Sequence, residues 1–239
     1  WSWAPLFADF DNDGWKDLFI ANGYRTDITN LDFMVYGKRA LFMGTPQANR
    51  KERLKILENY PGVYIGNYMY KNNKDLTFTD VSKNWGLSKP SYSNGSAYAD
   101  LDNDGDLDLY ITASGGSPDR KNVLFRNNGN GTFTKATGTG LDNSFYQSYG
   151  NAVGDYDNNG YQDIAVLNDN EPCLLWKNSG GSNKWIKVKL QGTVSNREAV
   201  GSLIYVYRGS TRFIRRTSCG SSYCSQNSFV QTIGVGSTN

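Results

Sequence analysis

The amino-acid sequence predicts a mainly β protein: part of a β-propeller or a similar repeat array, followed by a smaller β-rich segment. The first indication is composition, since 19 of the 23 acidic residues are Asp, Gly occurs 26 times and aromatic residues make up 14% of the 239 residues. Such a chain is poor in helix formers and rich in turn formers and strand aromatics. The second indication is an internal repeat at a fixed spacing, which is typical of arrays built from short strands.

The repeat has two parts. Three segments align without gaps, at residues 6–20, 97–111 and 152–166. Each combines an Asp/Asn/Gly turn with flanking apolar residues, the pattern of a strand, a tight turn and a second strand. A second phrase at residues 70–79 recurs at residues 125–134. The interval is 55 residues for both parts, from Asp100 to Asp155 and from Asn72 to Asn127. Several short strands in each period indicate a propeller blade.

The first interval is longer than the second. From Asp9 to Asp100 the chain runs 91 residues, and the excess falls near residues 27–62. Within it, residues 49–60 carry Leu54 and Leu57 at a spacing that puts both on one helix face, and a proline follows directly. We therefore expect a helical insertion on one blade.

The charge of the chain changes at a Ser/Gly-rich stretch, residues 178–182. Residues 181–239 carry eight basic residues and one acidic residue, a net charge of +7, whereas residues 1–180 carry 17 bases and 22 acids, a net charge of −5. This predicts a domain boundary between residues 1–180 and 181–239. The basic residues alternate with apolar ones at residues 185–190, as on the wet face of a strand. We therefore expect no nucleic-acid partner.

Each repeated segment carries a loop with oxygen-bearing side chains at positions 1, 3, 5 and 9 and a Gly at position 6. These residues are Asp9, Asp11, Asp13 and Asp17 in loop 1, Asp100, Asp102, Asp104 and Asp108 in loop 2, and Asp155, Asp157, Asn159 and Asp163 in loop 3. The backbone carbonyl at position 7, from Trp15, Asp106 or Tyr161, can add a further ligand. Calcium takes six to eight oxygens in irregular cages. The sequence therefore predicts three Ca²⁺ sites, of which loop 3, with three carboxylates instead of four, is expected to bind most weakly.

Two other structures could carry the same loop residues. An EF-hand needs a bidentate acid at position 12 and flanking helices, but position 12 is Ile20, Ile111 or Val166 and the neighbouring residues are strand-like. A metal-free Asp/Asn/Gly turn is opposed by electrostatics, because two carboxylates about 4 Å apart repel by roughly 4 kcal/mol at an effective dielectric constant of about 20. Metal-binding β-hairpin loops are the favoured interpretation.

The absence of certain residue types and patterns excludes several classes of function. The chain has no His, which excludes Ser-His and Cys-His nucleophilic pairs, His-bearing zinc sites and an imidazole base. No apolar run approaches the roughly 18 residues that a membrane helix needs, so we expect no transmembrane segment. Cys219 and Cys224 are close enough to form a local disulfide, with Cys173 left over, but three unpaired thiols fit the sequence equally well.

The repeated phrase Phe7-Ala-Asp-x-Asp-x-Asp-Gly-x-x-Asp17 resembles the FG-GAP/VCBS repeat of integrin-like propellers. Residues 78–81 and 124–133 resemble the strand-turn-strand element of the same repeats. Residues 185–193, 195–201 and 225–236 resemble the ASPIC/UnbV domain. The combination is similar to bacterial relatives of the cartilage acidic protein family.

The resemblance implies a secreted or cell-surface protein, here expected to be bacterial. In such proteins structural calcium holds a propeller module that serves adhesion or the binding of a protein or glycan, so an unknown protein or glycan is the expected partner. Two alternatives stay open. One is an accessory subunit of a bacterial surface assembly. The other is a polysaccharide-acting enzyme, which is disfavoured because no catalytic spacing exists outside the metal loops.

The resemblance also bears on the extent of the chain. Propellers of this family close with six to eight blades, whereas about three periods fit here. The ASPIC/UnbV pattern normally continues past residue 236. We therefore expect the chain to be part of a larger protein, with an incomplete ASPIC/UnbV domain at residues 181–239.

Overall fold

The computed structural model describes residues 2–23, 64–114, 121–141, 146–194 and 196–237. The helical insertion expected near residues 27–62 lies outside these residues. Within the described ranges all regular secondary structure is β, in strands β1 to β17. The predicted fold class, mainly β, is confirmed.

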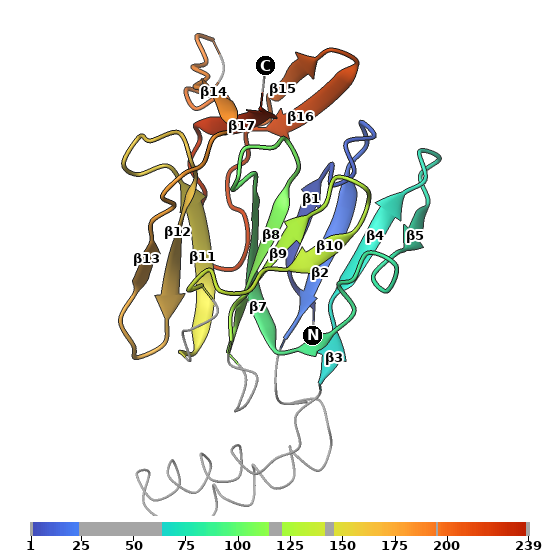
Figure 1. The fold of residues 1–239 in the computed structure, drawn as a ribbon, viewed down its shortest axis with the longest axis vertical. Helices are drawn as coiled ribbons and strands as arrows, with labels where there is room; N and C mark the ends of the chain where they lie inside the picture. The colour runs from blue at the N-terminus through green and yellow to red at the C-terminus, as the bar shows by residue number, and fades with distance from the viewer. Residues whose placement is uncertain (1, 24–63, 115–120, 142–145, 195, 238–239) are drawn as a thin grey trace, which may run out of the picture.

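Three antiparallel sheets lie side by side in the body of the molecule (Figure 1). The first sheet contains β1 (Ser2–Ala8), β2 (Asp17–Asn22), β4 (Tyr68–Asn72) and β5 (Phe78–Asp80); the second contains β7 (Ser93–Ala99), β8 (Asp108–Ala113), β9 (Val123–Asn127) and β10 (Phe133–Lys135); the third contains β11 (Ser148–Gly154), β12 (Asp163–Asn168) and β13 (Leu174–Trp176). A short separate pair consists of β3 (Ile65–Gly66) and β6 (Pro90–Ser91). Each large sheet follows chain order, as a propeller blade does, and the described residues form no closed ring.

The three sheets share one register. The last residue of the first strand faces the Asp that opens the second strand in all three: the pairs are Ala8 with Asp17, Ala99 with Asp108, and Gly154 with Asp163. A shift in register also occurs at the equivalent place in each first strand, between Trp3 and Leu6 in β1. The repeat in the sequence is therefore a structural repeat, and it sets each Asp-rich loop at the same end of its sheet.

The hydrophobic core lies between the sheets. One cluster joins the first and second sheets and includes Phe10, Phe19 and Leu109, all fully buried. A smaller cluster around Tyr110 and Ile164 joins the second and third sheets. Burial of these apolar faces, at roughly 25 cal/mol for each Å² removed from water, holds neighbouring sheets together.

The C-terminal segment, residues 181–239, forms two short ribbons in its described part. Strand β14 (Lys184–Val188) pairs with β17 (Gln231–Gly236), and β15 (Leu203–Arg208) pairs with β16 (Thr211–Arg216). Their own core consists of Ile204, Phe213 and Ile233. Figure 1 shows these ribbons at the top of the molecule, above the end of the sheets where the Asp-rich loops lie. The boundary expected at residues 180 and 181 stays a prediction.

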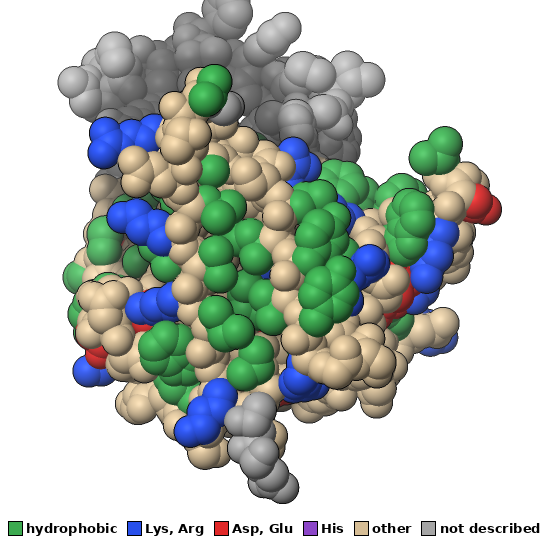
Figure 2. Space-filling view, turned by 90° about the horizontal axis from the view of Figure 1, so that it is seen from above, with side chains coloured by type: hydrophobic (Ala, Val, Ile, Leu, Met, Phe, Trp, Pro, Cys, Tyr) green, Lys and Arg blue, Asp and Glu red, His purple; other side chains and the backbone are tan. Residues whose placement is uncertain are grey.

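The surface of the C-terminal segment is partly apolar. Viewed from above, hydrophobic side chains gather in the middle of the molecule's face, and Lys and Arg side chains surround them (Figure 2). Leu203, Tyr205 and Tyr207 occupy alternate positions of β15, which places them on one side of the strand, and all three are exposed. Cys219 and Cys224 are unbonded and exposed, as is Cys173.

Candidate metal centres

The three Asp-rich loops have the same backbone conformation. Positive φ angles occur at Asn12 (54°) and Gly14 (94°) in loop 1, and at the equivalent residues of the other loops, which are Asn103, Gly105, Asn158 and Gly160. Asn and Gly are the residues that adopt this left-handed region at least cost. The sequence Asn-x-Gly at positions 4 to 6 therefore produces the curl that brings the flanking Asp residues together.

The carboxylate at position 1 closes each loop. The backbone N–H of the position-6 Gly donates to it in all three: Gly14 to Asp9 at 3.0 Å, Gly105 to Asp100 at 3.1 Å, and Gly160 to Asp155 at 2.7 Å. Since each carboxylate has further lone pairs, this contact orients it and leaves capacity for another ligand.

The carboxylate at position 9 ties each loop to the third strand of its sheet or to the residues after it. In loop 2, Asp108 accepts N–H groups from Leu101 at 3.2 Å and from Asn127 at 2.9 Å. The Asn127 side chain in turn donates to the carbonyls of Phe10 (2.7 Å) and Leu107 (3.2 Å). In loops 1 and 3 the equivalent N–H groups come from Asn72 and Asn178.

Sequence reasoning missed Asn72, Asn127 and Asn178 as part of the site. The equal 55-residue spacing of Asn72 and Asn127 was the available signal. Asn178 does not keep that spacing, because it follows Asn127 after 51 residues. The hydrogen bond from the Asn178 N–H to Asp163 is therefore seen only in the folded chain.

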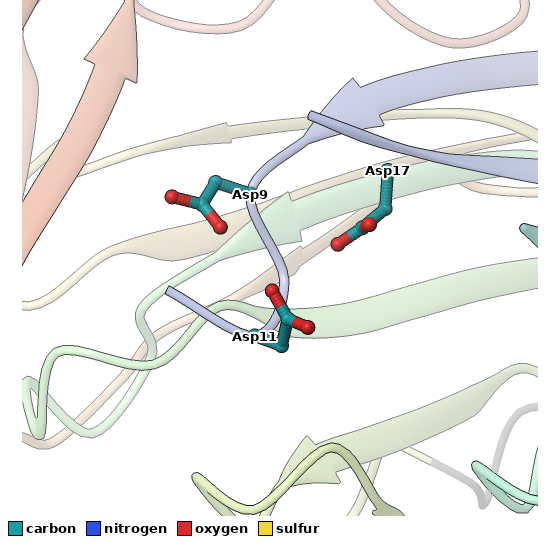
Figure 3. Close-up of side chains that lie close together, drawn as sticks. All are labelled: Asp9, Asp11 and Asp17. Atoms are coloured by element: carbon teal, nitrogen blue, oxygen red, sulfur yellow. The ribbon is translucent and has the colours of Figure 1, made fainter. Parts of the chain in front are cut away.

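Three acidic residues in each loop bring one carboxylate oxygen to within 4.8 Å of the others. The groups are Asp9, Asp11 and Asp17; Asp100, Asp102 and Asp104; and Asp155, Asp157 and Asp163. Figure 3 shows the first group, with Asp9 and Asp17 at the two strand ends and Asp11 on the connecting loop. Groups of this kind, with only oxygen donors, suit a hard divalent cation.

The remaining expected ligands are placed differently. Asp13 lies 3.3 Å from the Lys71 ammonium and 3.2 Å from that of Lys74. Asp108 lies outside the group of three in loop 2, although its oxygens accept backbone N–H groups as those of Asp17 and Asp163 do. Asn159 accepts the N–H of Tyr161 at 2.8 Å. The role of the position-7 carbonyls of Trp15, Asp106 and Tyr161 stays a prediction.

Burial makes several carboxylates of loops 1 and 2 hard to ionise without a cation. Desolvation, with smaller contributions from the nearby Asp11 and Asp13 carboxylates, raises the pKa of Asp9 to about 6 and that of Asp17 to about 7. In loop 2 burial raises the pKa of Asp100 to about 7 and that of Asp104 to about 6. A bound cation would remove this penalty, because it favours the charged form.

Basic side chains partly balance the loops. Lys71 pairs with Asp11, Arg126 lies 2.8 Å from Asp102, and Lys187 lies 2.6 Å from Asp155. In loop 2 this balance is incomplete, because the Oδ1 atoms of Asp100 and Asp102 are buried and have no hydrogen-bond partner. Buried polar atoms are rarely left unpaired, so the donor set of loop 2 fits a cation bound by these two oxygens.

The C-terminal segment packs on the position-6 Gly of every loop. A Cβ atom would overlap Arg212 at Gly14, Phe213 at Gly105 and Trp185 at Gly160. Glycine is therefore required for two reasons at Gly105 and Gly160: the φ angle and the close approach of an aromatic ring. At Gly14 the φ angle is the main reason, because the end of the Arg212 side chain can move.

The contact with loop 2 is the most extensive. The N–H of Gly234 donates to Asp100 Oδ2 at 2.8 Å, and the N–H of Gly236 donates to the Asn103 carbonyl at 2.9 Å. Arg215 is 4% exposed and donates to the Gly105 carbonyl at 3.1 Å. Burial lowers the pKa of Arg215, whereas the nearby Asp100 carboxylate favours its charged form. The C-terminal segment thus supplies part of the environment of the loop 2 carboxylates.

Models of two known protein families match parts of the chain. The model for an FG-GAP-like repeat matches residues 62–111 and 108–166, and the model for ASPIC and UnbV matches residues 192–239. The chain therefore carries FG-GAP-like repeats, which imply a β-propeller-like fold, followed by an ASPIC/UnbV domain. This confirms the resemblance drawn from the sequence.

One particular relative is cartilage acidic protein 1 of Xenopus tropicalis. The chain is 29% identical to it over 119 residues, which cover 48% of this chain and 18% of that protein. The chain thus spans less than a fifth of this relative's length.

FG-GAP-like repeats are typical of extracellular or cell-surface proteins. In the part of the chain that the structure describes, no helix has the length and apolar character needed to cross a bilayer.

Proposed function

We propose that the chain is part of an extracellular or cell-surface binding module in which loops 1, 2 and 3 each hold a structural Ca²⁺. The single observation that carries this proposal is the pair of buried carboxylate oxygens on Asp100 and Asp102 that lack any hydrogen-bond partner. They lie in a group of three carboxylates, and a similar group occurs in each of the other two loops. Calcium suits such a site better than magnesium, because it tolerates irregular cages of many oxygens.

The ion's role would be to stabilise the fold. Each loop joins the first two strands of a sheet and also contacts the C-terminal segment through its position-6 Gly. A divalent charge at this junction would convert repulsion between buried carboxylates into attraction. The surface loops and the C-terminal segment would then be held in place to bind a protein or a glycan, as loops on rigid scaffolds commonly do.

An accessory subunit of a larger surface assembly is the second candidate. The exposed side of β15, formed by Leu203, Tyr205 and Tyr207, favours it, because aromatic and aliphatic side chains clustered on one face mark contact surfaces. Both candidates assign the chain a binding role, with calcium as a structural component.

Calorimetric titration of calcium into chelator-treated protein tests the metal sites. We expect saturable binding and a rise in melting temperature, with Asp100→Asn reducing the number of occupied sites by one. Asp169→Asn is the matched control, because Asp169 is exposed and lies outside the three loops. No calcium binding and no change in melting temperature in the unmodified protein would refute the proposal. A glycan array, read with calcium and with chelator, then tests the binding role.

A further inference from the structure

A cavity of about 320 Å³ lies between the first sheet and the C-terminal segment. Strand β1 contributes Pro5 and Phe7, the end of loop 1 contributes Lys16, and the C-terminal segment contributes Arg216 and Ser221. Cavities that bind small molecules start at about 300 Å³. The cavity is therefore large enough for a ligand of monosaccharide size.

The charged side chains that line this cavity are all basic. Lys16 and Arg216 line it, and its lining contains no Asp or Glu. Within the described residues, neither the Lys16 ammonium nor the Arg216 guanidinium makes an ion pair or a side-chain hydrogen bond, whereas Lys71, Lys177 and Lys187 pair with carboxylates of the Asp-rich loops. Two uncompensated positive charges close to each other are stabilised by an anion between them.

Another wall of the cavity is apolar. Phe7 is 51% exposed and, with Pro5, offers an apolar surface on which a sugar ring can pack.

We propose that this cavity binds the carboxylate and ring of an acidic sugar, of the class that a uronic acid represents. The carboxylate would accept hydrogen bonds from Lys16 and Arg216, and the ring would lie against Phe7. This inference rests on the glycan-binding part of the proposed function and identifies its ligand class. It uses residues outside the three groups of carboxylates.

The test is a titration of sodium glucuronate into the calcium-loaded protein, in which saturation-transfer NMR detects binding. Glucose and sodium sulfate are titrated in parallel as probes. We expect saturable glucuronate binding that weakens as salt is added, since exposed charges are screened. Arg216→Gln and Lys16→Gln are each expected to weaken it about tenfold, the usual cost of losing a charged hydrogen bond. Arg197→Gln and Lys189→Gln are matched controls on exposed residues outside the cavity and are expected to leave binding unchanged.

Each other outcome overturns the proposal. Equal binding of glucose would show that the cations are not used, and binding of sulfate without glucuronate would show a simple anion site. Loss of binding in all four variants would place the site elsewhere. Because calcium binding is measured on the same samples, absent glucuronate binding with normal calcium binding refutes this inference alone. If Arg216→Gln fails to fold, Lys16→Gln tests the proposal instead, because Lys16 lies in loop 1 and not in the C-terminal segment.

Discussion

At the scale of single residues, the position-6 glycines are the most constrained residues of the site. Gly105 has a φ of +106°, and a Cβ there would meet the Phe213 ring. A left-handed conformation costs an ordinary residue about 1–2 kcal/mol, and overpacking costs about 1–3 kcal/mol more. Both penalties apply at Gly105, because an added Cβ would strain the backbone conformation and would also overlap the Phe213 ring.

We therefore expect Gly105→Ala to lower the free energy of unfolding by about 3 kcal/mol. Gly209→Ala is the matched control, because Gly209 also has a positive φ, +59°, but a Cβ at this position would have no neighbouring atom within 4 Å. That variant should lose only about 1 kcal/mol. Urea denaturation of both variants measures the difference. Equal losses would show that the Phe213 contact does not constrain Gly105.

Among the elements of the structure, the Asp-rich loops should make the free energy of unfolding depend on pH. The direction of this dependence should differ between the calcium-free and the calcium-bound protein. The pKa values of Asp17 and Asp100 are about 7 in the fold, above the ordinary 3.8. Without calcium, the stability associated with these protonated groups is fully present below the ordinary pKa and is lost as pH rises through about 7. With calcium the ionised carboxylates become ligands, so the stabilisation by calcium grows as pH rises.

We expect the melting temperature of the chelated protein to fall between about pH 5.5 and pH 8, and the gain caused by calcium to be larger at the higher pH. Thermal melting at both pH values, with calcium and with chelator, measures this. Asp100→Asn should flatten the dependence of the chelated protein, since the amide does not titrate. A chelated protein that becomes more stable as pH is raised over this range would contradict the assignment.

The three loops should also differ from one another. Loop 3 has Asn159 in place of a carboxylate, and its Asp155 and Asp157 lie 2.6 Å and 2.8 Å from the ammonium groups of Lys187 and Lys177. Lys71 and Lys74 pair with the carboxylates of loop 1 in the same way. The missing fourth carboxylate is therefore the reason why we expect loop 3 to bind calcium most weakly.

Replacing Lys187 by Gln should strengthen calcium binding at loop 3, because it removes a competing positive charge. Lys184→Gln, on the same strand and exposed, is the control. Calorimetric titration of both variants distinguishes them. Unchanged affinity in Lys187→Gln would mean that this ion pair does not compete with the metal.

At the scale of the whole molecule, the loops and the C-terminal segment form one connected structure. Phe213 and Trp185 pack on two loops, Arg212 packs on the third, and Gly234 donates to the Asp100 carboxylate. A change in the charge or position of Asp100 therefore reaches β17 directly. We expect calcium binding and the attachment of the C-terminal segment to stabilise each other.

Chelation should increase hydrogen exchange at the Gly234 and Gly236 amides, because their acceptors belong to loop 2. Exchange in the β8–β9 ladder, which lies in the core of the second sheet, should change less. Hydrogen exchange followed by mass spectrometry, with calcium and with chelator, measures both regions. Equal protection of β17 in the two conditions would show that loop 2 and the C-terminal segment are independent.

The strand-rich repeat, its 55-residue period and the Asp positions in each loop could all be predicted from the sequence. These features are local: alternating Asp residues, an Asn and a Gly curl a short stretch of backbone whatever surrounds it. The period also aligned Asn72 with Asn127, although their bonds to the position-9 carboxylates were not visible in the sequence.

The contacts between residues far apart in the sequence could not be predicted and are seen only in the folded chain. Arg212 packs against Gly14, and Trp185 packs against Gly160. Lys16 and Arg216 line the same cavity. No local pattern encodes these contacts, because they depend on how the C-terminal ribbons pack over the ends of three separate sheets. That packing follows from the burial of apolar faces across the whole molecule, a non-directional force that the spacing of residues along the chain does not specify.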